Sequence, residues 1–377
     1  MGKKAVVVGG SIAGVSCAHA LSAAGWEVVV LEKSSSGPTG SPTGAGLGLD
    51  PLSCKIIHSW LGVGDGDGDS DPLFRATMPL SIEQNQATDV EKKMSWTLTR
   101  DEEFNFRAAH WVDLHALLLG SLPPQVTFLW GHYFTSFHLA DDQGSVTLDA
   151  KVLQTGEIVQ IVGDLLVAAD GCLSSIRQTF LPLHKLRFGQ VRIGLPYLRY
   201  AAYCAWRGVL NFTEIEDSET IQVKKMKEDA ESIWLPELAH LMKSTPEPFV
   251  NVIYDSDPLD RLFWDNVVLV GDAAHPTTPH CVRSTNMSIL DAAVLGKCLE
   301  KWGSEDLKSA LNEYQSLRLP VVAKQVLHAR RVGRIKQGLS LPDCKPFDAK
   351  KASVEDCFEL QQKNVPFFSH IPDALLN

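Results

Sequence analysis

The segment VVVGGSIAG, residues 6–14, constrains the fold of this chain more than any other stretch. It nearly spells the dinucleotide-binding pattern G-x-G-x-x-G, with Gly9 and Gly14 in place and Ser11 where the middle glycine belongs. That pattern serves a tight turn between a strand and a helix whose N-terminal amides face a pyrophosphate. Ser11 is small enough to let the backbone approach a phosphate, and its hydroxyl can donate to one. The segment therefore predicts a cofactor site at the start of the chain.

The flanking residues complete a strand–helix–strand unit around this turn. Residues 4–8 predict a strand and residues 12–24 a helix, which carries small side chains where it must lie close to the sheet. Gly25 ends the helix, and WEVVVLEK predicts a second strand that ends at Glu32. An acidic side chain at this place can accept hydrogen bonds from both hydroxyls of an adenosine ribose. The combination favours a dinucleotide site over a purely structural turn.

Composition narrows the class of protein. The chain has 377 residues with 45% hydrophobic content, enough for a large core and two interwoven subdomains. Its net charge of −10 and lack of long basic tracts argue against a nucleic-acid partner. The eight scattered cysteines contain no C-x-x-C pair and suggest reduced thiols. Without a signal peptide or an apolar stretch of about 20 residues, we expect a cytoplasmic protein with no membrane contact.

The part that follows the first unit predicts mixed structure. GDGDGDSDP, residues 64–72, resembles a calcium loop, but Ser70 and Ala76 stand where an EF-hand needs Gly and Glu, so we expect a solvated acidic loop and no metal site. Short β-like runs lie between Phe74 and Phe106. HWVDLHALLLGSL predicts a helix, and residues 126–152 alternate like antiparallel strands with a turn at 141–144.

Two further motifs repeat one design. DLLVAADGCLSSIR places Asp170 after a buried apolar strand, at the start of a segment that carries Ser174 and Arg177. DNVVLVGDAAHPTTPHCVRSTNMSILDA places Asp272 after a second apolar strand, followed by a loop and a helix with Asn286 near its start. Open α/β sheets bind ligands at the carboxyl ends of their parallel strands. Two such aspartates therefore indicate binding residues more than ordinary helix caps.

In this order and spacing, the three motifs resemble those of the FAD-dependent aromatic hydroxylases, single-component flavoprotein monooxygenases related to p-hydroxybenzoate and salicylate hydroxylases. The resemblance covers nearly the whole chain and implies an α/β fold: a Rossmann-like FAD-binding domain of the glutathione-reductase type, an interwoven β-sheet substrate domain and C-terminal helices. The implied FAD-binding domain comprises residues 1–73, 106–185 and 262–340. The implied substrate domain comprises 74–105 and 186–261, and residues 341–377 form a C-terminal tail.

The resemblance also implies roles for individual residues. Gly9 and Gly14 would hold the FAD pyrophosphate, Glu32 the adenosine ribose, and Asp272 the ribityl or pyrophosphate part. Asp170, Gly171 and Arg177 match a motif that serves FAD and the visiting nicotinamide nucleotide, and Asn286 would lie near the flavin ring. The full expected cofactor-binding set is Gly9, Gly10, Ser11, Ile12, Ala13, Gly14, Glu32, Lys33, Arg107, Asp170, Gly171, Arg177, Gly271, Asp272, Ala273, Pro279 and Asn286.

The implied reaction uses NAD(P)H and O₂ to hydroxylate a small aromatic or heteroaromatic substrate through a flavin C4a-hydroperoxide. The cofactor carries this chemistry, so no catalytic triad or metal is required. The catalytic residues stay open: His275 and Arg207 are weak candidates, with His275 more often structural or flavin-adjacent and Arg207 more often a surface or salt-bridge residue.

The chain departs from the family in two places. Cys281 and Ser284 stand where glycines are common between Pro279 and Asn286. Between Leu210 and Leu262 the family usually has a longer segment with several strands, whereas here 51 residues, 211–261, predict mostly helix. Missing strands would leave the YCAWRG strand with an exposed edge. We therefore expect a shortened substrate domain and weak or uncoupled hydroxylation.

Two alternatives remain open from the sequence. The first keeps the flavin but loses hydroxylation, leaving an NAD(P)H oxidase that releases peroxide or a non-hydroxylating flavoprotein. The second is a flavin-free Rossmann dehydrogenase, for which the Asp170 and Asp272 motifs would be coincidences.

Overall fold

The fold is seen in a computed structural model. It describes residues 2–37, 46–63, 70–80, 84–89, 91–100, 105–140, 144–181, 198–207, 228, 231, 235–244, 249–303, 305–341 and 346–361. Most of the expected acidic loop at 64–72 and most of the expected turn at 141–144 lie outside these ranges.

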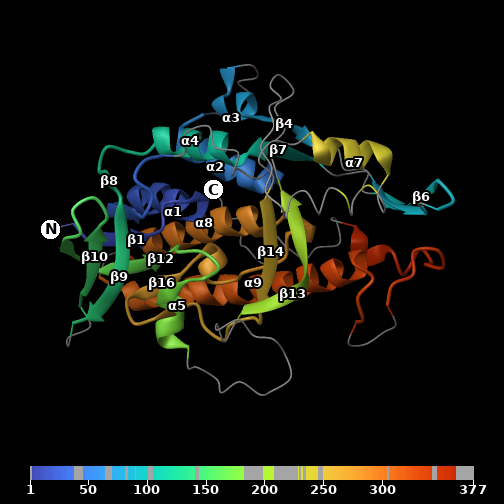
Figure 1. Ribbon diagram of the computed structural model, residues 1–377. Helices are drawn as coiled ribbons and strands as arrows, with labels where there is room; N and C mark the ends of the chain where they lie inside the picture. Colours follow the sequence, from blue (N-terminus) through green and yellow to red (C-terminus); the bar gives the residue numbers. More distant parts are fainter. Residues whose placement is uncertain are drawn as a thin grey trace.

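The main sheet has six strands in the order β15-β16-β12-β1-β2-β8 and lies in the left half of Figure 1. Five strands run parallel, and only the short edge strand β15 is antiparallel. The central strands are nearly continuous apolar runs with buried side chains, as expected of a parallel sheet covered on both faces. The strands are β1 (Lys4–Val8), β2 (Glu27–Glu32), β8 (Val126–Trp130), β12 (Leu165–Ala168), β15 (Phe263–Trp264) and β16 (Val267–Leu269).

The first strand–helix–strand unit is confirmed. β1 and β2 pair in parallel and are joined by α1 (Ile12–Ala23). The expectation for residues 126–152 was wrong in part, because β8 pairs in parallel with β2 and extends the main sheet. The antiparallel pairing in that stretch belongs to β9 and β10. Alternating side chains alone do not say whether a strand's partner runs parallel or antiparallel.

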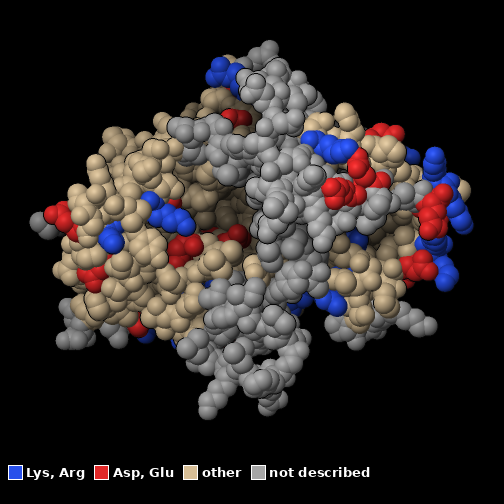
Figure 2. Space-filling model, viewed as in Figure 1, with Lys and Arg blue, Asp and Glu red and all other residues tan. Residues whose placement is uncertain are grey.

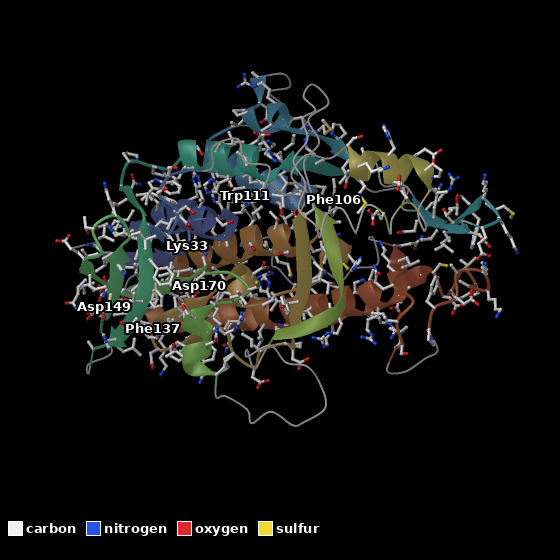
Figure 3. All side chains as sticks on the ribbon, in the orientation of Figure 1. Lys33, Phe106, Trp111, Phe137, Asp149 and Asp170 are labelled. Carbon is white, nitrogen blue, oxygen red and sulfur yellow. The ribbon has the colours of Figure 1, made fainter. Side chains whose placement is uncertain are left out.

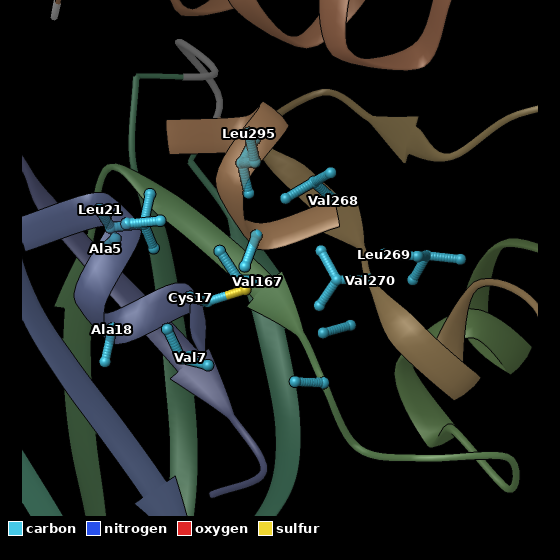
Figure 4. Packing of buried hydrophobic residues seen from close by; sticks show 14 of the residues in the cluster. Ala5, Val7, Cys17, Ala18, Leu21, Val167, Val268, Leu269, Val270 and Leu295 are labelled. Atoms are coloured by element: carbon cyan, nitrogen blue, oxygen red, sulfur yellow. The ribbon is translucent and has the colours of Figure 1, made fainter. Parts of the chain in front are cut away.

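Helices α1, α8 (Ser284–Trp302) and α9 (Leu307–Lys336) cover the sheet and pack against one another. Figure 4 shows Cys17 of α1, Val167 of β12 and Leu295 of α8 in this shared core. The hydroxyl of Tyr314 on α9 is buried and donates to the Leu269 carbonyl, 3.0 Å away, which ties α9 to β16. The C-terminal helices are thus part of the main core.

Three smaller sheets lie outside the six-stranded sheet. They have the orders β11-β10-β9, β3-β7-β4 and β5-β6. The elements are β3 (Gly46–Leu49), α2 (Pro51–Leu61), α3 (Pro72–Arg75), β4 (Thr77–Leu80), β5 (Gln84–Asp89), β6 (Met94–Arg100), β7 (Phe106–His110), α4 (Trp111–Gly120), β9 (His132–Leu139), β10 (Val146–Val152), β11 (Ile158–Gly163) and α5 (Ser175–Phe180). The expected strands between Phe74 and Phe106 are confirmed, and the helix expected over residues 110–122 is found at 111–120.

The middle of the chain contributes a strand pair that crosses the centre of the view in Figure 1. β13 (Leu198–Arg207) pairs antiparallel with β14 (Phe249–Ser256). The expectation that residues 211–261 are mostly helix was therefore wrong at 249–256, although α7 (Pro236–Lys243) is helical. Most of residues 208–248 lie outside the described part of the chain, so the loss of further strands stays a prediction.

Residues 346–361 pack back onto the molecule. The indole Nε1 of Trp96 on β6 donates to the Ala349 carbonyl at 3.2 Å, and Asn85 on β5 donates to the Leu360 carbonyl at 3.2 Å. A second small core joins Leu360 and Cys357 to α9 and to Cys281. None of the described helices is both long and apolar enough to cross a membrane.

The close contact between α1 and α8 can be tested at Gly296. A Cβ on this residue would lie 2.8 Å from both the Cβ and the carbonyl oxygen of Ala20. We expect Gly296→Ala to lower the free energy of unfolding by about 1–3 kcal/mol, because the helices must move apart. Gly120→Ala, at the end of α4 with no atom within 4 Å of its Cβ position, is the matched control. Equal denaturant midpoints for the two variants would contradict this packing.

Candidate functional site

The three sequence motifs meet at one edge of the main sheet. β1, β12 and β16 run parallel, so the turns that follow them, with Gly9, Asp170 and Asp272, lie at the same carboxyl edge. A groove with two cavities runs along this edge, and Ser11, Trp111, Ala169 and Gly171 line both cavities. Figure 2 shows a hollow near the middle of the visible face, and Figure 3 labels Trp111, Lys33 and Asp170 around the same place.

The turn after β1 is built from glycines that no other residue could replace without movement. Gly9 has φ +103°, and a Cβ there would lie 2.3 Å from the Ala169 carbonyl oxygen. A Cβ on Gly14 would lie 1.8 Å from the Gly9 carbonyl oxygen. Ser11 precedes α1, but its side chain makes no capping hydrogen bond to the helix. Ser11, Ile12 and Ala13 line the groove at the start of α1, where the first helix amides and the Ser11 hydroxyl can bind an anion.

The first cavity, of about 740 Å³, lies beside the end of β2. The Glu32 carboxylate accepts hydrogen bonds from the Gly10 amide at 2.8 Å and from the Ser34 amide at 2.9 Å. These contacts fix the carboxylate at the cavity wall beside Lys33. Its position and size suit an adenosine, with Glu32 as the acceptor for the ribose.

Asp170 lines the same cavity from the other side of the glycine turn. Its Oδ2 accepts from the Ser175 amide at 2.9 Å, whereas its buried Oδ1 has no hydrogen-bond partner in the structure. Gly171 next to it has φ +80° and no atom within 4 Å of its Cβ position. An orphaned acceptor beside open space fits a ligand that donates a hydrogen bond, since buried polar atoms are otherwise paired.

Arg177 is buried instead of facing a ligand. Its guanidinium donates to the carbonyls of Ala273 at 2.6 Å and Cys172 at 2.5 Å, and burial lowers its pKa. The side chain therefore ties the second motif to the third.

The second cavity, of about 390 Å³, lies beyond the glycine turn. β3, β14, the turn after β16 and the start of α8 line it. The Asp272 carboxylate faces it and accepts from the Ser284 hydroxyl at 2.7 Å. Ile12, Ala13 and Pro279 also line this cavity, whereas Ala273 is buried behind it. A cofactor with its adenosine at Glu32 and its phosphates at α1 would place its other end here.

Asp291, buried on α8, holds the turn that carries Asp272. Its Oδ2 accepts from the Gly271 amide at 2.9 Å and from His275 Nε2 at 2.5 Å, and its Oδ1 accepts from Arg318 Nε at 2.7 Å. Burial by itself raises the pKa of Asp291, but His275 and Arg318 outweigh it and hold the pKa below its usual range. His275 is thus buried in a structural cluster and lines neither cavity.

Two other expected site residues lie apart from the groove surface, and of Arg207 only the backbone is described. Asn286 is fully buried and bridges β3 to α8, with its amide donating to the carbonyls of Gly48 and Val282. Arg107 lies on β7, where it donates to Thr77 and stacks over the Phe74 ring. The backbone of Arg207 pairs with Phe249 at the end of β13.

Several groove residues were missed by the sequence reasoning. His115, buried on α4, donates from Nε2 to the Gly10 carbonyl at 2.6 Å and stacks on Trp111 with ring centroids 5.1 Å apart. Arg283 pairs with the buried Asp50 at 3.1 Å. The HWVDLH stretch showed only a helix with an apolar face, and nothing in its pattern marked Trp111 or His115 as groove residues.

Comparison with known proteins fits this geometry. Residues 4–127 match the family model described as FAD dependent oxidoreductase, and residues 202–329 match the one described as FAD binding domain. The resemblance to the FAD-dependent aromatic hydroxylases is confirmed. It is 24% identical to 6-hydroxynicotinate 3-monooxygenase of Pseudomonas fluorescens, over 84% of this chain and 88% of that protein. It is 26% identical to 3-hydroxybenzoate 6-hydroxylase of Klebsiella oxytoca, over 88% of each protein.

Solved structures support the same fold. HpxO of Klebsiella pneumoniae, complexed with FAD and uric acid, superposes with a TM-score of 0.68 at 22% identity, over 89% of each chain. The 2,6-dihydroxypyridine-3-hydroxylase of Arthrobacter nicotinovorans superposes with a TM-score of 0.69 at 18% identity, over 94% of this chain and 99% of that one. The α/β fold expected from the sequence is confirmed.

This monooxygenase therefore uses FAD, and the family uses NAD(P)H. The flavin-free dehydrogenase considered from the sequence is overturned by the match of residues 202–329 to an FAD binding domain. The glycine turn, the orphaned Asp170 oxygen and the two connected cavities fit this cofactor.

Glu32 offers a direct test of the adenosine end. Glu32→Ala should weaken FAD binding by about 1.5–3 kcal/mol, the value of a charge-assisted hydrogen bond. The readout is the FAD dissociation constant from titration of the apoprotein. Glu27→Ala is the control, since Glu27 lies at the other end of β2 in an exposed pair with Lys4. An unchanged constant for Glu32→Ala would refute this role.

Asp272 tests the other end of the groove. Asp272→Ala removes the carboxylate and should give protein depleted of flavin after purification, measured as flavin absorbance per chain. Ser284→Ala removes only the partner of that carboxylate and should retain most of the FAD. Full FAD occupancy in Asp272→Ala would show that the carboxylate is not a binding group.

Proposed function

We propose that this monooxygenase hydroxylates a small aromatic or heteroaromatic substrate, with electrons from NAD(P)H and one oxygen atom from O₂. The observation that carries the proposal is the second cavity, which is joined to the adenosine cavity and walled by strand residues. FAD binds along the groove through the expected set around Gly9, Glu32, Asp170 and Asp272. In this proposal residues 74–105 and 186–261 build the substrate domain.

The substrate lies where β14 faces the turn after β16. Ile253 and Tyr254 of β14 line this cavity together with Pro276 and Thr277 of that turn. Its lining is mixed apolar and polar, and the buried Thr277 hydroxyl, which has no hydrogen-bond partner in the structure, can fix the orientation of a small ring. The named relatives act on hydroxybenzoate and hydroxynicotinate, which are rings of this size.

The protein contributes binding, orientation and electrostatics. When bound, FAD takes electrons from NAD(P)H and activates O₂ for transfer to an electron-rich ring. α8 begins beside the second cavity with Ser284, Thr285 and Ser288 in its lining, and its N-terminal amides stabilise negative charge on the cofactor. Arg283 is neutralised by Asp50 and adds little net charge. No described side chain is needed as an acid or base.

A second function is favoured by the strand pair β13-β14, which has no further strand among the described residues. If the wall over the second cavity is incomplete, water enters and the activated oxygen is released as H₂O₂. The protein would then act as an NAD(P)H oxidase. This outcome follows from the same cofactor and the same groove.

One assay separates these functions. We expect at least one of a panel of phenols, hydroxybenzoates and hydroxypyridines to stimulate NAD(P)H consumption and to yield hydroxylated product, together with considerable H₂O₂. Consumption of NAD(P)H, release of H₂O₂ and formation of product are measured in the same reaction. If every compound gives as much H₂O₂ as NAD(P)H consumed and no hydroxylated product, only the oxidase function remains. Product equal to NAD(P)H would show that the remaining residues close the cavity.

A further inference from the structure

One residue of the groove has a backbone conformation that its side chain disfavours. Val282 has φ 53° and ψ 35°, in the left-handed region where a β-branched residue is a clear outlier. Among the described residues, Lys93 and Asp265 are the other non-glycine positions with positive φ, and neither lines the groove. Strain of this kind persists only where the surroundings impose it.

The side chain of Val282 fills a space on β3. A Cβ on Gly48 would lie 2.4 Å from Cγ1 of Val282, so the two positions share one volume. Both residues line the second cavity. The Val282 side chain, which comes from the loop before α8, thus occupies the space next to β3 that a side chain at position 48 would fill.

Asn286 holds this contact in place. Its Nδ2 donates to the Gly48 carbonyl at 2.8 Å and to the Val282 carbonyl at 2.9 Å. The Val282 amide donates to the Pro279 carbonyl at 3.0 Å. The two backbones are therefore fixed at this separation whatever side chain stands at 282. A glycine would adopt the same backbone without the steric cost, so the function of valine here lies in its side chain.

We propose that Val282 is a positioning residue that closes the flavin end of the groove between β3 and the loop before α8, and so keeps water from the bound flavin. Its effect on oxygen transfer rests on the proposed function, because an open wall would let activated oxygen escape as H₂O₂. Its effect on water access depends only on bound FAD and can be measured without any substrate.

The test uses the holoenzyme and quenching of its flavin fluorescence by iodide. Val282→Gly should raise the quenching constant about twofold or more, because the wall opens. The double variant Val282→Gly with Gly48→Ala should return toward the wild-type value, since the new methyl group takes the place of Cγ1. Asp265→Gly, which relieves a similar backbone strain outside the groove, should leave quenching unchanged.

Several outcomes would overturn the inference. An unchanged constant in Val282→Gly, an equal rise in Asp265→Gly, or no recovery in the double variant would each show that Val282 does not close the groove. If Val282→Gly purifies without FAD, Val282→Ala replaces it, and an unchanged constant there has the same meaning. With an active enzyme, H₂O₂ per NAD(P)H should rise in Val282→Gly and fall again in the double variant. If no compound is hydroxylated, the proposed function is contradicted, but the conclusion from fluorescence quenching about Val282 remains valid.

Discussion

The close approach of α1 to the turn after β1 is the constraint on which the rest of the structure depends. The Gly9 carbonyl oxygen stands 1.8 Å from where a Cβ of Gly14 would be, and Gly9 itself touches the backbone after β12. On its other side, α1 meets α8 at Gly296 with similar closeness. The glycines at positions 9, 14 and 296 thus allow the close contacts that place the N-terminus of α1 beside three strand ends. This placement creates the groove.

Buried polar groups then fix the second and third motifs around this turn. Arg177 links the two turns by hydrogen bonds to backbone carbonyls, and Asp291 holds both ends of the segment from Gly271 to His275. Each of these charges is buried and would be costly if it lost its partners. Residues expected to touch the cofactor therefore include some, such as Arg177 and Asn286, that shape the site from behind it.

The groove walls come from segments far apart in the chain. β3, β14 and the loop before α8 surround the second cavity, and Val282 occupies the volume beside Gly48. Pairs of this kind depend on which surfaces meet, and each of the two residues looks unremarkable in its own stretch of sequence. The same holds for His115, whose bond to the Gly10 carbonyl joins α4 to the glycine turn.

The sequence by itself determined the parallel sheet, the strand ends that carry Gly9, Asp170 and Asp272, and the resemblance to FAD-dependent aromatic hydroxylases. These follow from local patterns: apolar runs, glycines that allow close backbone contact, and acidic residues at strand ends. Only the tertiary structure decided that β8 joins the main sheet, that His275 is buried against Asp291 and that Arg107 lies apart from the groove. Strand direction, burial and side-chain pairing depend on contacts between segments that are distant in the sequence. A local sequence pattern does not indicate which distant segment it will contact.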